Sequence, residues 1–386
     1  MPIKIVHIIM RWDHSIGGVK RFVFNAVQAL DANTFQQAML PVGRRGNSPI
    51  DSRQNEFITI YEPIIKESSA AASDLLFAGA ELRRRLKDIR PDIVHIHCNN
   101  GLGYLYAQSA LNVGIDRRII HSHNSALGDN GLIKRITHKM LCRRYKDAPT
   151  HRIACSQAAG DHLFGSASYE VIHNGIDLEA YGFDISKRRA IRDELGIGDG
   201  VVTLGHVGSG IPVKNTEMVL RIALAMKGMG HKVKCLLIGD GDEVSDLKRR
   251  ACEMGLYEDA HFLGTVTNTC DYYNAMDAFL LPSFYEGLPI SLIEAQANGL
   301  PCFTSTHVSK EADTTNTVEY LPIENDVMVW AEAIIANQCT DIHRRGHISV
   351  QNCETLALNG YSLAGLGVQL MHLYMEADQV YPYGGN

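Results

Sequence analysis

The stretch from residue 278 to residue 294 reads AFLLPSFYEGLPISLIE and joins a short apolar run to a turn and a helix. Four consecutive apolar residues, 278–281, are typical of a strand buried on both faces of a parallel sheet. Gly287 allows a ligand to approach the backbone closely. Pro289 suits the first turn of a helix, because its missing N–H would have no partner there. The stretch therefore predicts a strand, a ligand-binding turn and a helix, the repeating unit of an α/β fold.

The same alternation extends along the whole chain. Between the apolar runs lie segments of helical period, such as the one-sided apolar stripe that begins at Val19 and ends at Leu30. Strands that alternate with helices predict right-handed βαβ crossovers and parallel sheets. The predicted strands are residues 3–9, 37–42, 57–61, 92–97, 118–123, 151–155, 169–173, 201–207, 232–238, 260–263, 277–281, 301–304 and 317–321.

The pattern restarts once, after Asn174-Gly175-Ile176-Asp177, and a chain of 386 residues is long enough for two domains. We predict two doubly wound α/β domains, residues 1–180 and 181–360. The polar segment 184–200 is predicted to be a hinge between them because it is charged and contains three glycines. A helix within about 361–386 is expected to pack back on the first domain.

Composition excludes several classes of protein. The chain has 37 Lys and Arg against 43 Asp and Glu, a net charge of −6, which argues against a dedicated nucleic-acid binder. The N-terminus has no targeting signal, and no apolar run is long enough to span a membrane. Nine cysteines are scattered singly without a Cys-x-x-Cys pair, which predicts free thiols in a reducing cytoplasm.

Glycine-rich turns and charged side chains mark a site for a phosphorylated ligand. Gly17-Gly18 precedes a helix, whose first N–H groups can hold an anion, although the spacing is not that of a nicotinamide-cofactor site. In the second half, Gly208-Ser209-Gly210 is followed by Lys214, a natural partner of phosphate. Carboxylates at Glu286 and Glu294 can accept hydrogen bonds from hydroxyls on either side of a diphosphate. Each turn alone is also compatible with a plain strand-to-helix connection.

Two His-x-His pairs end predicted strands, His95 with His97 and His121 with His123. Residues two apart share one face of a strand, so each pair has the spacing of a chelate. No carboxylate or third histidine stands at ligand spacing nearby, and we therefore predict no metal site. Because parallel strands open into the ligand crevice at their carboxyl ends, His123 is expected to face a polar ligand. His95 and His121 fit a structural role equally well.

Residues 132–146 combine basic and apolar side chains at helical spacing. Such a helix can lie on an anionic membrane, and it can equally be a solvated basic face. The sequence leaves both readings open.

Taken together, these segments resemble the family 4 retaining glycosyltransferases, whose GT-B fold consists of two Rossmann-like domains facing a central cleft. The resemblance extends over nearly the whole chain and is nearest to bacterial capsule and exopolysaccharide enzymes. It is carried, in order, by Gly17-Gly18-Val19, Asp92-Ile93-Val94-His95-Ile96-His97, His123-Asn124, Ile153-Ala154-Cys155-Ser156, Asn174-Gly175-Ile176-Asp177, Lys214-Asn215, Gly239-Asp240-Gly241, and Glu286 with Glu294.

The resemblance implies a retaining transfer of sugar from a nucleotide-diphosphate sugar, expected to be a UDP-sugar, to a glycan or lipid-linked acceptor in surface polysaccharide biosynthesis. The first domain would then serve the acceptor, and the second would bind the donor. No cofactor is expected, because the donor is itself a substrate. No divalent metal is expected either, because Lys214 and backbone N–H groups stabilise the charge of the leaving diphosphate and we identify no Asp-x-Asp motif to hold a cation. The enzyme would be cytoplasmic, with peripheral contact at the inner face of the plasma membrane through residues 132–146.

The family also implies roles for single residues. Glu294 is expected to hold the ribose hydroxyls, Lys214 to stabilise the diphosphate leaving group, and His123 to contact the donor sugar. The expected catalytic residues are Glu286, Lys214 and His123. The expected donor-binding residues are Gly17, Gly18, Ser209, Lys214, Val266, Glu286, Gly287, Leu288, Pro289, Ile290 and Glu294.

The chain departs from the family at Ser209, where many members carry an arginine five residues before the lysine. The diphosphate then lacks one potential cation, unless another arginine fills the space. Two alternatives to the transferase therefore stay open. One is a GT-B-fold sugar-nucleotide 2-epimerase, which would need no acceptor. The other is a catalytically weak protein that binds sugar nucleotides.

Overall fold

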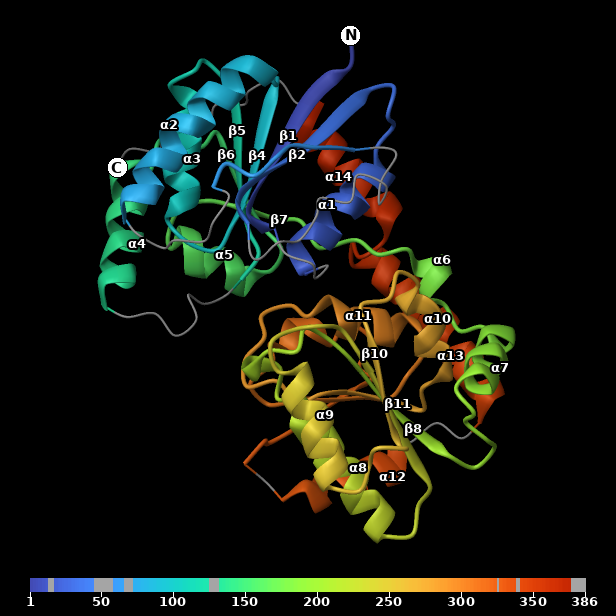
Figure 1. Cartoon of the computed structure of the whole chain (residues 1–386). Coiled ribbons are helices and arrows are strands. Elements are labelled where there is room, and N and C mark those ends of the chain that lie inside the picture. The colour runs from blue at the N-terminus through green and yellow to red at the C-terminus, as the bar shows by residue number, and fades with distance from the viewer. Residues whose placement is uncertain are drawn as a thin grey trace.

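The computed structural model describes residues 1–12, 17–44, 58–65, 72–124, 132–324, 326–337 and 341–375, and all statements below concern these residues. Two α/β domains lie one above the other in Figure 1, each with a sheet between layers of helices. Every strand predicted from the sequence is present. Cys339 and the predicted continuation of the last helix to residue 386 lie outside the described residues. The eight described cysteines are unpaired thiols.

The first sheet has seven parallel strands in the order β3-β2-β1-β4-β5-β6-β7. This order reverses between β1 and β4, which is where a doubly wound fold binds its ligand. The elements are β1 (Ile3–Trp12), α1 (Gly18–Ala29), β2 (Phe35–Arg44), β3 (Thr59–Ile60), α2 (Ala72–Ile89), β4 (Ile93–Cys98), α3 (Leu102–Leu111), β5 (Arg117–Ser122), α4 (Leu132–Arg144), β6 (His151–Ala154), α5 (Gln157–Phe164) and β7 (Glu170–Val171).

The second sheet has six parallel strands in the order β10-β9-β8-β11-β12-β13, and its order reverses between β8 and β11. Its elements are α6 (Leu178–Tyr181), α7 (Ile185–Glu194), β8 (Val202–Val207), the 3-10 helix η2 (Pro212–Lys214), α8 (Thr216–Gly228), β9 (Val233–Ile238), α9 (Val244–Glu253), β10 (Ala260–Gly264), α10 (Thr269–Ala275), β11 (Ala278–Leu281), α11 (Ile290–Ala297), β12 (Cys302–Ser305), η3 (Lys310–Ala312), β13 (Val318–Leu321), α12 (Val327–Asn337) and α13 (Ile342–Leu358).

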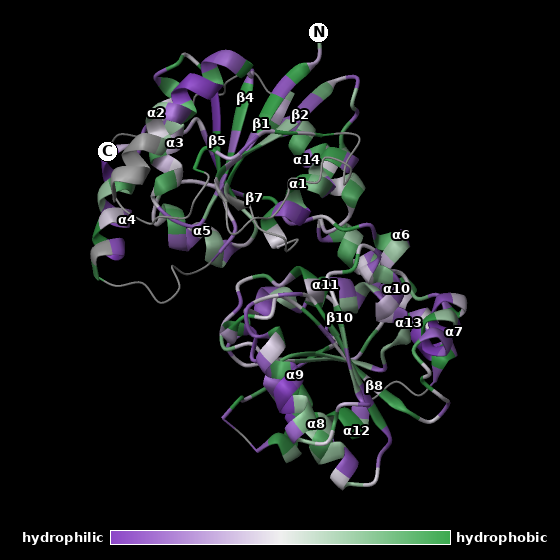
Figure 2. Cartoon of the chain, in the orientation of Figure 1, coloured by the Kyte–Doolittle hydropathy of each residue, from purple (hydrophilic) through white to green (hydrophobic). Residues whose placement is uncertain are grey.

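Both faces of each sheet are buried, which explains why the strands are nearly continuous apolar runs. In β1, Val6 and Ile8 enter one core cluster, and Ile5 and Ile9 enter the cluster on the opposite face. Figure 2 shows hydrophobic stretches along the strands and hydrophilic residues on outer helices such as α7 and α9. The alternation of side chains therefore ties each sheet to helices on both sides.

The chain crosses between the domains twice, side by side. The backbone of Ile176 exchanges hydrogen bonds with Tyr361 (2.8 Å) and Leu363 (3.0 Å), so the outgoing and returning segments pair. The last described helix, α14 (Leu363–Met375), then packs against α1, and its Leu366 and Leu370 join the core of the first domain. Figure 1 shows α14 beside α1.

A further contact between the domains comes from a helix cap. Both carboxylate oxygens of Glu311, in η3, accept hydrogen bonds from backbone N–H groups at the start of α5, those of Gln157 (3.0 Å) and Ala158 (3.2 Å). A carboxylate at a helix N-terminus is favourable because it meets unpaired N–H groups and the positive end of the helix dipole.

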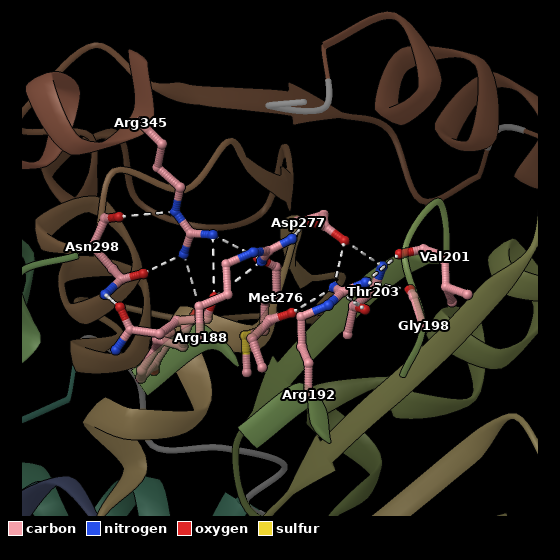
Figure 3. Close-up of polar contacts among 12 residues, drawn as sticks. Arg188, Arg192, Gly198, Val201, Thr203, Met276, Asp277, Asn298 and Arg345 are labelled. Carbon is pink, nitrogen blue, oxygen red and sulfur yellow. Dashed lines mark hydrogen bonds and ion pairs between the residues drawn. The ribbon is translucent and has the colours of Figure 1, made fainter. Parts of the chain in front are cut away.

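The predicted hinge at 184–200 is wrong. Most of this segment is helix α7, which Asp184 caps by accepting hydrogen bonds from the N–H groups of Ser186 and Lys187. Arg188 and Arg192 reach from α7 to the carboxylate of Asp277, at 2.6 and 3.2 Å, and Arg192 also donates to the carbonyls of Gly198 and Val201. The charges that suggested a solvated linker instead hold the helix on the second domain (Figure 3).

Arg345 completes this network from α13 and is almost fully buried. It donates to the backbone carbonyls of Met276 (2.7 Å) and Tyr273 (2.9 Å), close to where Arg188 binds the same turn. Asn298 accepts from Arg345 through both its side chain and its backbone (Figure 3). Helices α7 and α13 are thus joined to one turn of the sheet by buried guanidinium groups.

Candidate functional site

A cavity of about 350 Å³ lies between the two domains, at the carboxyl ends of strands from both sheets. This volume is in the range of small-molecule sites. All twelve site residues expected from the sequence line it, and they come from both domains. From the first domain come Gly17, Gly18 and His123, and from the second Ser209, Lys214, Val266, Glu286, Gly287, Leu288, Pro289, Ile290 and Glu294.

Glycines let two turns of the second domain stack beneath this cavity. A Cβ at Gly239, where φ is 130°, would lie 1.9 Å from the carbonyl oxygen of Gly208. A Cβ at Gly241 would lie 2.5 Å from that of Gly210. Only glycine therefore fits at these positions, and the close approach brings the backbone after β8 and β9 to one edge of the cavity.

Lys214 pairs with Glu286 in this structure, although the two come from different loops. Both side chains are mostly buried. Lys214 ends η2, and Asn215 follows in the left-handed region at φ 50°, with its side chain donating to the carbonyl of Pro282 (3.1 Å). The Lys-Asn pair thus turns the chain and ties it to the loop that carries Glu286.

Glu294 is a buried carboxylate, 3% exposed, on α11. Its Oε2 accepts a hydrogen bond from the hydroxyl of Tyr273 (2.8 Å). Arg21 of the first domain also lines the cavity. Burial acts against the charged form of Arg21, but Glu294 and neighbouring groups outweigh it and raise the pKa of the guanidinium. Arg21 and Glu294 therefore attract each other across the two domains.

The first-domain wall offers acceptors that have no partner. The side-chain oxygens of Asn99 and Asn174 and the Nδ1 of His123 are buried without a hydrogen bond, and all three residues line the cavity. Gly18 approaches the other wall most directly, because a Cβ there would lie 3.8 Å from Cδ1 of Ile290. The two asparagine oxygens are acceptors and call for a ligand that donates hydrogen bonds, whereas Nδ1 of His123 accepts or donates according to its tautomer.

The expectation that no third histidine lies near the His-x-His pairs is wrong. Strand pairing sets His7 beside His95 and His97 beside His121, so five histidines gather on one face of the first sheet. Two overlapping groups of three place their ring nitrogens within 4.8 Å, one of them with His7. The rings bond to one another, as His97 does to His7 (3.0 Å) and to His123 (2.8 Å).

Two family models match this chain. The model described as "Glycosyltransferase Family 4" matches residues 16–180, and the one described as "Glycosyl transferases group 1" matches residues 187–336. Together they account for most of the chain and for both walls of the cavity. The chain is a glycosyltransferase with these two family domains.

Curated relatives of this glycosyltransferase extend over its whole length. A Bacillus subtilis (strain 168) protein named as a glycosyltransferase, EpsF, is 29% identical over 96% of each chain. The Escherichia coli "UDP-Gal:alpha-D-GlcNAc-diphosphoundecaprenol alpha-1,3-galactosyltransferase" is 26% identical over 97% of each chain. "Capsular polysaccharide biosynthesis glycosyltransferase CapH" of Staphylococcus aureus is 24% identical, over 92% of this chain and 96% of that protein.

Solved structures match the fold. Anabaena Alr3699/HepE in complex with UDP-glucose superposes with a TM-score of 0.74 at 16% identity, over 96% of this chain and 98% of that one. WaaG, a glycosyltransferase involved in lipopolysaccharide biosynthesis, superposes with a TM-score of 0.71 at 15% identity, over 97% and 100%. The fold of this glycosyltransferase is therefore GT-B. Within the described ranges, no helix has the length and apolar character that a membrane span requires.

Sequence reasoning missed several residues of the glycosyltransferase site. Arg21 is one of two basic side chains among the described residues that line the cavity, the other being Lys214, and it stands four residues after Gly17 in the first turn of α1. Its position after the glycines was the available signal. Asn99 directly follows β4, as His123 follows β5, and the same strand-end argument would have found it.

The expectation that the chain has no Asp-x-Asp motif is wrong, because Asp240-Gly241-Asp242 is one, and two carboxylates at this spacing can hold a divalent cation. Asp240 lines the cavity, and its Oδ1 accepts from the N–H of Gly241 (2.8 Å). Asp242 is not among the lining residues. Among the described residues, the groups of three or more potential metal ligands within 4.8 Å both consist of first-domain histidines.

Proposed function

We propose that this glycosyltransferase moves a sugar from a UDP-sugar to a glycan or lipid-linked acceptor, with retention at the anomeric carbon and without a divalent metal. The observation that carries the proposal is the pairing of Lys214 with Glu286 beside the first turn of α11, in a cavity bounded by both domains. That corner combines a cation, backbone N–H groups and a carboxylate, which are the groups needed to bind a diphosphate and the sugar attached to it.

Cleavage of a glycosyl–diphosphate bond moves negative charge onto the leaving group while the sugar acquires oxocarbenium character. Groups already oriented toward that charge lower the barrier most. Lys214 and the N–H groups at the start of α11 are fixed by the fold before a donor binds. The donor phosphates would replace Glu286 as the partner of Lys214, which frees the carboxylate for hydroxyls of the sugar.

The names of similar proteins support the choice of donor and acceptor. The E. coli relative is named for UDP-Gal as donor and for an acceptor linked to diphosphoundecaprenol. The structure of Anabaena HepE contains UDP-glucose. All three curated relatives described above are named as glycosyltransferases, which favours transfer over the 2-epimerase alternative.

Metal independence is proposed because the positive charge is already available from the protein. Lys214 is the cation nearest to Glu286, and Arg21 adds a second one from the opposite wall. We also propose that Arg21 compensates for Ser209, since it brings an arginine to the cavity from the first domain. Addition of excess EDTA should leave the transfer rate unchanged, and restoration of activity by Mg²⁺ or Mn²⁺ would contradict this part of the proposal.

Retention is proposed to occur by attack of the acceptor on the face from which the diphosphate departs. Once the donor phosphates have replaced Glu286 as the partner of Lys214, the freed carboxylate accepts hydrogen bonds from the sugar, and we assign it that role and not the role of a nucleophile. Proton NMR of the first-formed product should show the anomeric configuration of the donor. Mass spectrometry after incubation with a 2-fluoro sugar donor should show no adduct, and a sugar bound covalently to Glu286 would overturn this mechanism.

The function is tested by a screen of UDP-, GDP- and ADP-sugars for binding by calorimetry and for release of the nucleotide. We expect a UDP-sugar to bind and to be slowly hydrolysed even without an acceptor. Conversion of UDP-GlcNAc to its 2-epimer would favour the epimerase. Tight binding with neither hydrolysis nor transfer would favour the catalytically weak protein suggested by Ser209.

We also propose that α4 contacts an anionic membrane, where a lipid-linked acceptor would lie. Leu132, Ile136 and Met140 are exposed by 71%, 57% and 56%, and they lie one helical turn apart. Lys139 and Arg143 are exposed beside them. Figure 1 shows α4 at the outer edge of the first domain. An apolar stripe flanked by basic residues is suited to the interface of an anionic bilayer.

Sedimentation with vesicles tests this contact. The full chain should sediment with anionic vesicles at low salt and less at high salt. A content of roughly 30–40% phosphatidylglycerol gives the vesicles the approximate charge density of an anionic leaflet. Lys139→Gln with Arg143→Gln should reduce the bound fraction. Lys232→Gln with Lys248→Gln, which removes two exposed charges from the second domain, is the matched control. Equal binding by both variants would contradict the role of α4.

A further inference from the structure

Three of the five clustered histidines form a hydrogen-bonded row that leads from the core to the cavity. His7 Nε2 lies 2.9 Å from Oε1 of Gln37, and His7 Nδ1 lies 3.0 Å from Nε2 of His97. His97 Nδ1 lies 2.8 Å from Nε2 of His123. His123 lines the cavity, and its own Nδ1 has no partner. The row is thus anchored at one end and unpaired at the other.

The anchor gives the row a direction. The side-chain N–H of Gln37 donates to the carbonyl of Ala26 (3.4 Å), so its oxygen faces His7 and can only accept. His7 must therefore carry its proton on Nε2, because a lone pair there would face the lone pairs of an oxygen. A flipped amide gives no alternative, since its oxygen would then face the carbonyl of Ala26.

The position of the proton on His7 determines its position on His97 and then on His123, because a neutral imidazole has one N–H and one lone pair. With its proton on Nε2, His7 accepts at Nδ1 from the Nε2–H of His97. His97 then accepts at Nδ1 from the Nε2–H of His123. His123 is left with a lone pair on Nδ1, the atom that is buried without a partner. Burial lowers the pKa of His7 to about 4 and that of His123 to about 3, which is consistent with neutral rings.

We propose that Gln37 is a positioning residue that sets the tautomer of His123, so that His123 accepts a hydrogen bond from a hydroxyl of the donor sugar. This inference rests on the proposed function, that the cavity binds a sugar nucleotide. It adds to that function a preference among donor sugars. A sugar that places a hydroxyl against His123 is favoured, and a sugar that places a carboxylate there meets a lone pair and is disfavoured.

The rest of the first-domain wall has the same polarity. The side-chain oxygens of Asn99 and Asn174 are also acceptors without partners at this cavity. A wall of acceptors fits the hydroxyl-rich edge of a neutral sugar. The row ends at an amide, which is neither an acid nor a base at ordinary pH, and it therefore fixes a polarity and does not conduct protons to solvent.

A second branch of the cluster shows what an unanchored row lacks. His95 contacts the hydroxyl of Tyr374 through Nδ1 (2.6 Å) and His121 through Nε2 (3.2 Å). A hydroxyl both donates and accepts, so Tyr374 allows either tautomer of His95. The amide of Gln37, in contrast, is fixed in orientation by its hydrogen bond to the carbonyl of Ala26. Only the branch that reaches His123 therefore has a defined direction of hydrogen bonding.

The first test measures the tautomers without any ligand. Two-bond proton–nitrogen correlation spectra of the full chain, with 15N in the histidine rings, should show His7, His97 and His123 protonated on Nε2. Gln37→Met removes the acceptor at similar size and should move the proton of His123 partly or wholly to Nδ1. Gln37→Glu, whose carboxyl is expected to stay protonated at this buried position, keeps an acceptor toward His7 and an O–H toward the carbonyl of Ala26, and it should keep the wild-type tautomer. His7→Phe also interrupts the row, and it should move the proton of His123 in the same way as Gln37→Met.

The second test couples Gln37 to His123 through donor binding, with UDP-glucose and UDP-glucuronate as probes. Gln37→Met should weaken UDP-glucose binding by about tenfold and reduce the preference for UDP-glucose, as expected for one lost hydrogen bond. In a His123→Phe background the same substitution should have no further effect, because its influence passes through His123. A purely structural role would weaken binding in both backgrounds.

The two tests fail separately. If the screen of UDP-, GDP- and ADP-sugars finds no ligand of the wild-type protein, the proposed function is wrong, and the spectra still decide the tautomer. A wild-type His123 protonated on Nδ1, or equal losses from Gln37→Met with and without His123, would overturn the role of Gln37.

Discussion

The two domains line one cavity with side chains of different kinds. The wall from the second domain is charged: Lys214 pairs with Glu286, and Glu294 accepts from the hydroxyl of Tyr273 and is attracted by Arg21 of the other domain. The wall from the first domain is mostly neutral, and three of its acceptors, on Asn99, His123 and Asn174, have no partner. Arg21 is its one basic group among the described lining residues.

This difference assigns different work to the two walls. A pair of opposite charges destabilises the empty protein little, because each charge compensates the other. When a donor binds, its phosphate replaces the carboxylate of Glu286 as the partner of Lys214. Unpaired acceptors reduce stability until a hydroxyl satisfies them. The second domain should therefore determine the rate of bond cleavage, and the first should determine which sugar is accepted. Each variant below changes a side chain of one domain and leaves the other domain unchanged.

The largest effect is expected from Lys214→Ala, which removes the cation nearest to the departing diphosphate. We expect kcat to fall about 100- to 1,000-fold, with KM for the donor changed much less, because the charge develops in the transition state. Steady-state kinetics with the best UDP-sugar measure both constants. Lys232→Ala, at an exposed position of the same domain, is the control. A rise in KM with an unchanged kcat would assign Lys214 to ground-state binding only.

The buried histidine row behind the neutral wall should make the protein sensitive to acid. Burial lowers the pKa of His7 from 6.5 to about 4, so between these pH values the unfolded chain binds more protons than the folded chain. Its contribution is therefore complete above pH 6.5 and is lost as the pH falls toward 4, by about 3 kcal/mol. Urea unfolding at a series of pH values measures the free energy of unfolding.

Two variants isolate this contribution. His7→Leu should be less stable at neutral pH, but its stability should fall less steeply between pH 6.5 and 4, because the titrating ring is absent. His343→Gln, which removes an exposed histidine of α13, should keep the wild-type slope. The same slope in His7→Leu would mean that His7 is not neutral in the folded protein.

A smaller effect is expected from Glu294→Gln. The amide oxygen still accepts from Tyr273, but a hydrogen bond from a ribose hydroxyl to a neutral amide is weaker than one to a carboxylate. We expect the affinity for UDP to fall by about tenfold, measured by calorimetry. Glu258→Gln, an exposed carboxylate of the same domain, should bind UDP like the wild type. Unchanged affinity in Glu294→Gln would remove Glu294 from the nucleotide site.

The strands, and those lining residues that directly follow them, could be predicted because both depend on local patterns, whereas Val266 was expected only from the family resemblance. Apolar runs identify strands of a doubly wound sheet, and the carboxyl ends of such strands meet at the ligand. The fold class and the position of His123 followed from these two rules. Lys214, Glu286 and Glu294 were found in the same way, from turns that follow β8 and β11 and from the helix after β11.

What the sequence did not predict depends on contacts between distant segments. The arginines of α7 suggested a solvated hinge, but Asp277 and carbonyl groups far along the chain bury them. His7 and Gln37 carry no local signal, since each is a single polar residue in an apolar strand. Only the pairing of β1 with β2 and β4 shows that Gln37, His7 and His97 lie in one row.

The smallest change in stability is expected at the neutral wall, and its direction is informative. Asn174 is 6% exposed and its side-chain oxygen has no partner, whereas Asn298 is fully buried and bonds to Tyr181 and Arg345. Asn298→Ala should lower the free energy of unfolding by about 2–3 kcal/mol, because it leaves the buried groups of Tyr181 and Arg345 without this partner. Asn174→Ala should change the free energy of unfolding by less than about 1 kcal/mol, since the amide that it removes satisfies little in the empty protein. It should nevertheless raise KM for the sugar nucleotide several-fold. A loss of stability as large as that of Asn298→Ala, with KM unchanged, would mean that the first-domain wall supports the fold and does not select the sugar.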